Sequence, residues 1–405
     1  MSRRSPLYEW ITEVSTHLPH LSKPQATVLA LWSFGIVLAH RCTLPAVATF
    51  LSPLLKKPFN TVRQRLREWY QAAPDKKGSH RRELDITTCF APLLAWLLNH
   101  WPCTRIAVAL DATTLGNRLT VLSLSLVYRG TAIPVAWKVL QGNQPHAWKP
   151  EWLKLLQWFA AQVDPTWTVI VLTDRGLYAR WLFQAIVGLG WHPMMRVTRL
   201  GKFLPEGWTR PRAFPKFVPR VGGAWQGRGI AFPRKPERRL DCTLLACWTE
   251  GHEEGWYLLT DLPPQAAAAA WYGLRMWIEH GFEQFKSTGW NWEKTRIEEP
   301  DRAGRMWLAI ALATFWVVGV GGQHDHEQRV RETFSHCPAT EVRQRGPEKG
   351  GSPGRLVSVL NQGIAVILSR LLEGRLPKPE RWYPEPWPGI ETIVHTREHE
   401  PTSKQ

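Results

Sequence analysis

Three acidic residues stand where carboxylates could hold divalent metal ions: Asp111, Asp174 and Glu279. The two aspartates each follow an apolar run, residues 105–110 and 167–173, that is typical of a buried strand. A side chain at the end of such a strand leaves the core yet is rigidly placed, which suits metal or substrate binding. An aspartate there can also simply cap a turn or the next helix. Two aspartates at two strand ends of one sheet favour the metal site.

The chemistry that these acids predict is metal-assisted hydrolysis or transfer of a phosphodiester. Carboxylate oxygens are hard ligands of the kind that Mg²⁺ binds. Two such ions, roughly 3.5–4 Å apart, can stabilise the attacking and leaving oxygens of an in-line displacement. The acids alone are compatible with several hydrolases. The sequence has no HExxH motif, no paired CxxC and no P-loop, so we expect Mg²⁺, with Mn²⁺ as a substitute, rather than zinc or ATP.

The third acid lies in a segment that two prolines open and that is predicted to be one helix over residues 263–286. At about 100° per residue, four polar residues fall on a stripe roughly 60° wide beside an apolar stripe. They are Tyr272, Arg275, Glu279 and Lys286. A purely solvated helix face is the alternative explanation of this stripe.

The elements that position the aspartates are predicted from runs of β-branched and aliphatic residues. Three antiparallel strands joined to a β-α-β unit predict an α/β fold, in which a mixed sheet is flanked by helices. The predicted strands are residues 105–110, 120–128, 132–140, 167–173 and 191–197, and the predicted helices are 151–163 and 178–187.

A basic stretch separates this region from the glutamate helix. Residues 199–240 hold eleven basic residues and two acids, a net charge of nine out of the chain's +17. Short strand-like pieces in it, followed by strands at 242–248 and 256–260, predict a β-rich insertion that contacts DNA. A disordered basic loop is the alternative.

Residues 1–100 are predicted to be helical, with a helix at 45–54, a turn at 55–59 and a basic helix after it. Thr61 and Gln64 have the spacing of a capping box, which marks a helix start. Arg63 and Arg67 are four residues apart and share a face. The layout is that of a helix-turn-helix that contacts DNA, and a solvated charged face is an equally good interpretation.

The bulk composition is consistent with a DNA-binding protein. The chain has 51 Lys and Arg against 34 Asp and Glu, and such a surplus favours a polyanionic partner, although a basic solvated surface is also possible. The apolar run 307–322 is shorter than the ~20 residues that a bilayer requires, so we expect a buried helix. The six scattered cysteines favour a reducing cytoplasm. Most of the 24 tryptophans are expected in the core.

The residues quoted so far resemble a known family. The spacing Tyr272-x2-Arg275-x3-Glu279-x6-Lys286 resembles the Y-R-E-K signature of bacterial insertion-sequence transposases of the DDE class. The motifs LDAT at 110–113 and LTDRG at 172–176 resemble the first and second aspartate motifs of that family. The resemblance covers roughly residues 104–320 and implies a ribonuclease H-like core, interrupted by a β-rich insertion and preceded by a helical N-terminal domain.

The resemblance also implies roles. Asp111, Asp174 and Glu279 would bind two Mg²⁺ ions. Tyr272, Arg275 and Lys286 would hold DNA near the transposon end. Water would nick the element's ends, and the freed 3′-hydroxyl would attack another phosphodiester, in cut-and-paste movement through hairpin ends. The expected partners are the double-stranded terminal inverted repeats, the target DNA and a second copy in a homodimer. We expect this to occur at the bacterial nucleoid in the cytoplasm, without a membrane.

Five regions are predicted along the chain. They are a DNA-binding domain (1–100), the first part of the catalytic core (101–199), the insertion (200–262), the second part of the core (263–322) and a C-terminal region for dimerisation (323–405). Residues 323–355 are predicted to be loop-like and 356–372 to be helical. A core helix is the preferred interpretation of 356–372, and a dimer contact is the alternative. Glu283 lies beside the polar stripe and is either a supporting or a solvated side chain. A catalytically inactive, DNA-binding descendant and a host nuclease are the competing hypotheses.

Overall fold

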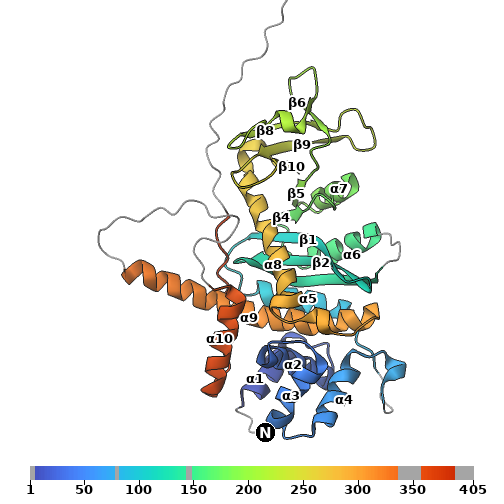
Figure 1. Cartoon of the computed structure of the whole chain (residues 1–405), viewed down its shortest axis with the longest axis vertical. Coiled ribbons are helices and arrows are strands. Elements are labelled where there is room, and N and C mark those ends of the chain that lie inside the picture. Colours follow the sequence, from blue (N-terminus) through green and yellow to red (C-terminus); the bar gives the residue numbers. More distant parts are fainter. Residues whose placement is uncertain (1–4, 78–81, 143–147, 336–356, 388–405) are drawn as a thin grey trace, which may run out of the picture. The chain divides into compact units, whose positions relative to one another are not determined.

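The computed structural model describes residues 5–77, 82–142, 148–335 and 357–387, and the side chains of 331–335 are left aside. The chain divides into two compact units (Figure 1). The first comprises Met1–Val169 and Leu274–Glu385. The second comprises Ile170–Gly273 with Pro386–Gln405, so its main segment is inserted into the sequence of the first.

The first unit begins with the predicted helices. They are α1 (Pro6–His17), α2 (Lys23–Ala39), α3 (Leu44–Leu55), α4 (Phe59–Tyr70) and α5 (Thr87–Leu98). Helix α2 is apolar on every face and is buried from Val28 to Val37. The capping-box prediction for α4 is wrong, because the helix begins at Phe59 after Pro58, and Thr61 already lies in its first turn.

Three antiparallel strands follow in the first unit, in the order β3-β2-β1. They are β1 (Arg105–Leu115), β2 (Leu119–Tyr128) and β3 (Thr131–Gln141), and α6 (Trp148–Ala160) packs on β2 and β3. Arg129 and Gly130, both with positive φ, form the tight β2–β3 turn. The meander is confirmed, but β1 does not end before Asp111. This residue pairs with Ser123 inside the strand, because the polar residues after Asp111 continue the ladder with β2.

The long helix α9 (Pro300–Ser335) forms the centre of the first unit, between the N-terminal helices and β3 (Figure 1). It is long and apolar enough to cross a membrane, but its apolar window is entirely buried inside the protein. The predicted buried helix is therefore confirmed. The prediction of a loop directly after residue 322 is wrong, because α9 continues to Ser335 through a polar stretch that still has good helix formers. Residues 336–356 lie outside the described chain.

Helix α10 (Val359–Leu372) packs on α9 through glycines. A Cβ on Gly363 would stand 1.9 Å from the carbonyl oxygen of Val317, and one on Gly321 would stand 2.0 Å from that of Val359. The two helix backbones therefore touch at a distance that only glycine allows.

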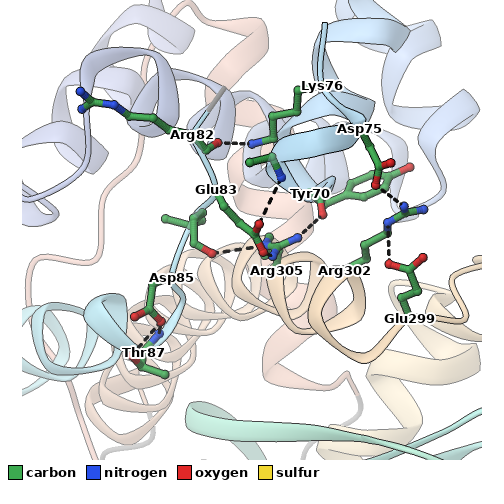
Figure 2. Close-up of polar contacts among 12 residues, drawn as sticks. Tyr70, Asp75, Lys76, Arg82, Glu83, Asp85, Thr87, Glu299, Arg302 and Arg305 are labelled. Carbon is green, nitrogen blue, oxygen red and sulfur yellow. Dashed lines mark hydrogen bonds and ion pairs between the residues drawn. The ribbon is translucent and has the colours of Figure 1, made fainter. Parts of the chain in front are cut away.

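A buried polar network joins the N-terminal helices to α9 (Figure 2). Arg305, whose side chain is only 4% exposed, donates to the carbonyl oxygens of Tyr70 at 2.8 Å and Leu84 at 3.2 Å, and to the carboxylate of Glu83. A second arginine of α9 forms more exposed ion pairs: Arg302 with Asp75 at 2.7 Å and with Glu299 at 2.9 Å.

The second unit is mostly β-structure, with strand order β4-β5-β10-β9-β8-β6-β7. Strands β4 and β5 are parallel and the others pair antiparallel. Within this unit, the residues of the predicted insertion, 200–262, are mostly β-structure as expected, whereas β4, α7 and β5 belong to the predicted first part of the core. Its elements are β4 (Thr168–Thr173), α7 (Arg180–Gly188), β5 (His192–Arg196), β6 (Lys202–Pro205), β7 (Arg212–Ala213), β8 (Ala224–Ala231), β9 (Leu240–Cys247) and β10 (Trp256–Thr260).

Candidate active site

The segment that carries the glutamate is not the continuous helix that the sequence predicts. It consists of two 3₁₀ turns (Pro264–Ala266 and Ala269–Arg275), the short helix α8 (Met276–Glu283) and a π-helical turn (Gln284–Thr288). The alanine run favours a helix by propensity, but packing overrides it, since Ala267 and Ala268 are buried in the second unit. The angles computed for one regular helix therefore do not apply across Tyr272 and Lys286.

Helix α8 is fixed to the β2–β3 turn in the first unit. The hydroxyl of Thr131 donates to the side-chain carbonyl of Gln284 at 2.7 Å, and the His280 Nδ1 lies 3.2 Å from the carbonyl oxygen of Gly130. A Cβ on Gly281 would stand 3.3 Å from Ala132, so the helix backbone lies close against β3. Helix α8 therefore packs on β3 and also contacts β2 and β1.

With α8 in this position, Asp111 and Glu279 both pair with the side chain of Arg275. The guanidinium of Arg275 donates from Nη2 to Asp111 Oδ2 at 2.7 Å and from Nη1 to Glu279 Oε1. Its side chain is 9% exposed, that of Asp111 is 14% exposed and that of Glu279 is 43% exposed. A charge-assisted bond of this kind is short and strong, so it keeps the two carboxylates gathered at one place.

A second cation stands close to Asp111. Lys286 lies in the π-helical turn and is half-buried. Burial lowers the pKa of the Lys286 ammonium, while the negative charges of Glu293 and Asp111 act to raise it. The first unit thus brings Asp111, Arg275, Glu279 and Lys286 together. By contrast Glu283 is exposed.

Two further predicted site residues, Asp174 and Tyr272, belong to the second unit. Asp174 directly follows β4, as the sequence predicts, and its Oδ1 accepts from the backbone N–H of Leu177 at 3.0 Å. Tyr272 is buried, and its hydroxyl donates to the carbonyl oxygen of Thr173 at 3.2 Å. This contact, which the sequence pattern did not suggest, fixes the residue next to Asp174. The ring of Tyr272 also packs edge-on against Trp256.

The chemistry of the donors in the first unit is consistent with a hard divalent cation. Asp111 and Glu279 supply carboxylate oxygens, and the side chain of Glu279 is open enough for a ligand to approach. Over the described ranges, no cluster of three or more His, Cys, Asp or Glu side chains could hold a metal ion.

The N-terminal basic helix is exposed in the way a nucleic-acid contact requires. Helices α3 and α4 are joined by a short turn, and Arg63 and Arg67 lie on the exposed side of α4, while Val62 and Leu66 pack inward. The turn adds two further exposed cations that the sequence interpretation passed over: Lys56 and Lys57. In the second unit, eight of the basic residues predicted to face DNA are exposed: Arg199, Lys202, Arg210, Lys216, Arg220, Arg234, Lys235 and Arg239.

A solved structure, the cryo-EM structure of a piggyBac transposase synaptic complex with hairpin DNA, is 12% identical and matches over 85% of each chain with a TM-score of 0.35, a likeness too low to carry an argument. No curated protein matches. The transposase DDE domain family matches residues 108–316, slightly more than half of the chain. The order of strands and helices in that range is that of the predicted ribonuclease H-like α/β fold. The chain belongs to the family of transposases with a DDE domain.

Proposed function

We propose that this transposase cuts the ends of an insertion sequence by metal-dependent hydrolysis and joins the freed 3′-hydroxyls to target DNA. The observation that carries the proposal is the pairing of Asp111 and Glu279 on one guanidinium. Carboxylates held this close, at positions that match the family's motifs, are suited to share a divalent cation. Asp174 is the third acid of the proposal, on the strength of its motif and its place at the end of β4.

Each residue has a proposed task. Asp111, Asp174 and Glu279 hold two Mg²⁺ ions, or Mn²⁺ as a substitute, which when bound supply Lewis-acid stabilisation of the oxygens around the reacting phosphorus. In the first step a water oxygen forms a bond to phosphorus and the 3′-oxygen leaves. In the second step the oxygen of that 3′-hydroxyl forms a bond to the phosphorus of another phosphodiester, whose own 3′-oxygen leaves and takes up the proton as a new 3′-hydroxyl. The expected product is a hairpin on the element's end before insertion into target DNA.

DNA is held by cations in this proposal. Arg275 and Lys286 contact DNA phosphates beside the acids. Tyr272 is the third residue proposed to hold the DNA near the transposon end. Arg63 and Arg67 contact the terminal inverted repeat, since both are exposed on one face of α4. Contacts of this kind position the duplex without reading its sequence. Two element ends must be brought together, so we propose that a homodimer acts on the bacterial chromosome in the cytoplasm.

The test is cleavage of a duplex that carries the inverted repeats flanking the gene. Glu279→Gln is expected to abolish Mg²⁺-dependent cleavage, because the amide neither carries charge nor holds a hard cation well. Glu283→Gln, the matched control on the exposed side of the same helix, is expected to retain most of it. The opposite pattern would refute the assignment of Glu279.

The competing functions appear as distinct outcomes of this assay. Salt-dependent DNA binding without metal-dependent cutting would indicate a binding-only descendant of a transposase. Cleavage without joining of the cut ends to a target plasmid would indicate a nuclease. The proposed transposase gives both cleavage and joining, and both stop when EDTA removes the metal.

A further inference from the structure

The ion pairs of Arg275 with Asp111 and Glu279 lower the affinity of these carboxylates for any other cation. The guanidinium occupies Asp111 Oδ2 and Glu279 Oε1, which are oxygens that a hard divalent cation would also take. Arg275 is fully charged at every physiological pH. Two positive groups that draw on the same carboxylates compete, and the stronger the arginine pair, the weaker the metal binding.

The surroundings allow the arginine side chain to exchange partners while the acids stay in place. A hydrogen bond from Thr131 to Gln284 and one from His280 to the Gly130 carbonyl fix α8 to the β2–β3 turn, and Asp111 lies inside the β1–β2 ladder. The outer partner, Glu279, is 43% exposed, so the Arg275–Glu279 pair meets solvent on one side. A phosphate arriving from that side can accept two parallel N–H bonds from a guanidinium.

We propose that Arg275 is an internal counterion of Asp111 and Glu279 that a DNA phosphate draws away, so that DNA binding and divalent-cation binding strengthen each other. The inference rests on the proposed function, since it assumes that the acids bind metal and that DNA reaches them. Without DNA the arginine neutralises the acids and weakens metal binding. With DNA the guanidinium pairs with phosphate, and both carboxylates become available.

This coupling is reciprocal by thermodynamic necessity. If DNA raises the affinity for a divalent cation by some factor, the cation raises the affinity for DNA by the same factor. The arrangement would suppress metal-loaded enzyme until a duplex is in place.

The experiment measures Mn²⁺ binding directly and does not depend on cleavage. Free Mn²⁺ is followed by its electron paramagnetic resonance signal during titration of the full chain, with and without a 25-base-pair duplex of arbitrary sequence. Asp111→Asn is the blank, because it reports the Mn²⁺ that DNA and the rest of the protein bind. The wild-type site is expected to bind Mn²⁺ about tenfold more tightly with DNA, since charge-assisted hydrogen bonds correspond to changes of that order.

The decisive variant is Arg275→Gln. It is expected to bind Mn²⁺ about tenfold more tightly than the wild type without DNA, and DNA should add less than a factor of about two. An arginine that only supports the fold would give unchanged or weaker Mn²⁺ binding in Arg275→Gln, and that result overturns the inference. If Arg275→Gln loses the wild-type circular dichroism spectrum, Arg275→Lys is scored instead. One ammonium cannot bridge two carboxylates in the manner of a guanidinium, so its affinity for Mn²⁺ without DNA should also rise.

The two proposals fail in different ways. Wild-type cleavage of the flanking repeats, combined with unchanged Mn²⁺ affinity in the Arg275 variants, refutes the counterion role and leaves the transposase function standing. Coupled Mn²⁺ and DNA binding in a protein that neither cuts nor joins those repeats supports the counterion role and refutes the proposed function.

Discussion

Replacement of Arg305 by alanine tests whether the network in Figure 2 holds the N-terminal helices on α9. The side chain of Arg305 is 4% exposed and satisfies the carbonyl oxygens of Tyr70 and Leu84. Each buried carbonyl that loses its donor costs about 1–3 kcal/mol. Glu83 is 41% exposed, so its carboxylate can be hydrated in the variant and adds little. For the two carbonyls together, the expected loss in the free energy of unfolding is about 2–6 kcal/mol.

The matched control is Arg302→Ala, three residues earlier on the same helix. Its partners Asp75 and Glu299 are 46% and 58% exposed, and exposed pairs contribute about 0–1 kcal/mol. Urea unfolding followed by circular dichroism measures both variants under the same conditions. Equal losses, or a larger loss for Arg302→Ala, would refute the view that the buried carbonyls determine the stability of this junction.

Three further predictions concern other parts of the molecule. Asp325→Asn leaves the buried Arg129, whose Nε donates to Asp325 at 3.0 Å, without its counter-charge. Urea unfolding should show a loss of about 3–5 kcal/mol, and a loss below about 1 kcal/mol would contradict this. Arg63→Ala and Arg67→Ala should each weaken DNA binding for every sequence and lower the slope of log K against log salt by about one. An unchanged slope would place both residues away from DNA. Burial lowers the pKa of His17, the opposing effect of Glu13 being smaller. His17 therefore takes up a proton less readily in the folded state than in the unfolded state. Its contribution to the free energy of unfolding is fully present above pH 6.5, and it is lost as the pH falls from there through the lowered pKa of the folded state. His17→Gln should reduce this loss in urea unfolding at pH 8 and pH 5, and an equal loss in both proteins would contradict it.

Local sequence patterns were sufficient for much of the sheet. Runs of β-branched and aliphatic residues predict β2 and β3 to within about a residue at each end. Gly130 marks the turn between them, because a position with positive φ favours glycine. The end of β1 was missed because Asp111 was taken to stop the strand, whereas pairing with Ser123 continues through it. Such pairing is a property of the neighbouring strand and is not visible in the strand's own composition.

The glutamate segment shows why the site was only partly predictable. The motif spacing places Arg275, Glu279 and Lys286 correctly in one region, because short stretches of 3₁₀ and π-helix change the angle between residues but not their proximity along the chain. The breaks accompany packing that the spacing does not contain, such as the burial of Ala267 and Ala268 between the two 3₁₀ turns. The sequence also gives no sign that Arg275 bonds to both acids at once.

The position of α9 in the chain bears on how the protein must be synthesised. Helix α2, apolar on every face, packs against a helix that begins only at Pro300. At about 5–20 residues per second, the ribosome needs roughly 15–60 s to reach that point. Once α2 and its neighbours are complete they can pack on one another, but for most of this interval they lack α9. Nascent chains that stop before α9 should therefore expose apolar helices and engage chaperones or aggregate, and the first unit should acquire protease resistance only after α9 has emerged.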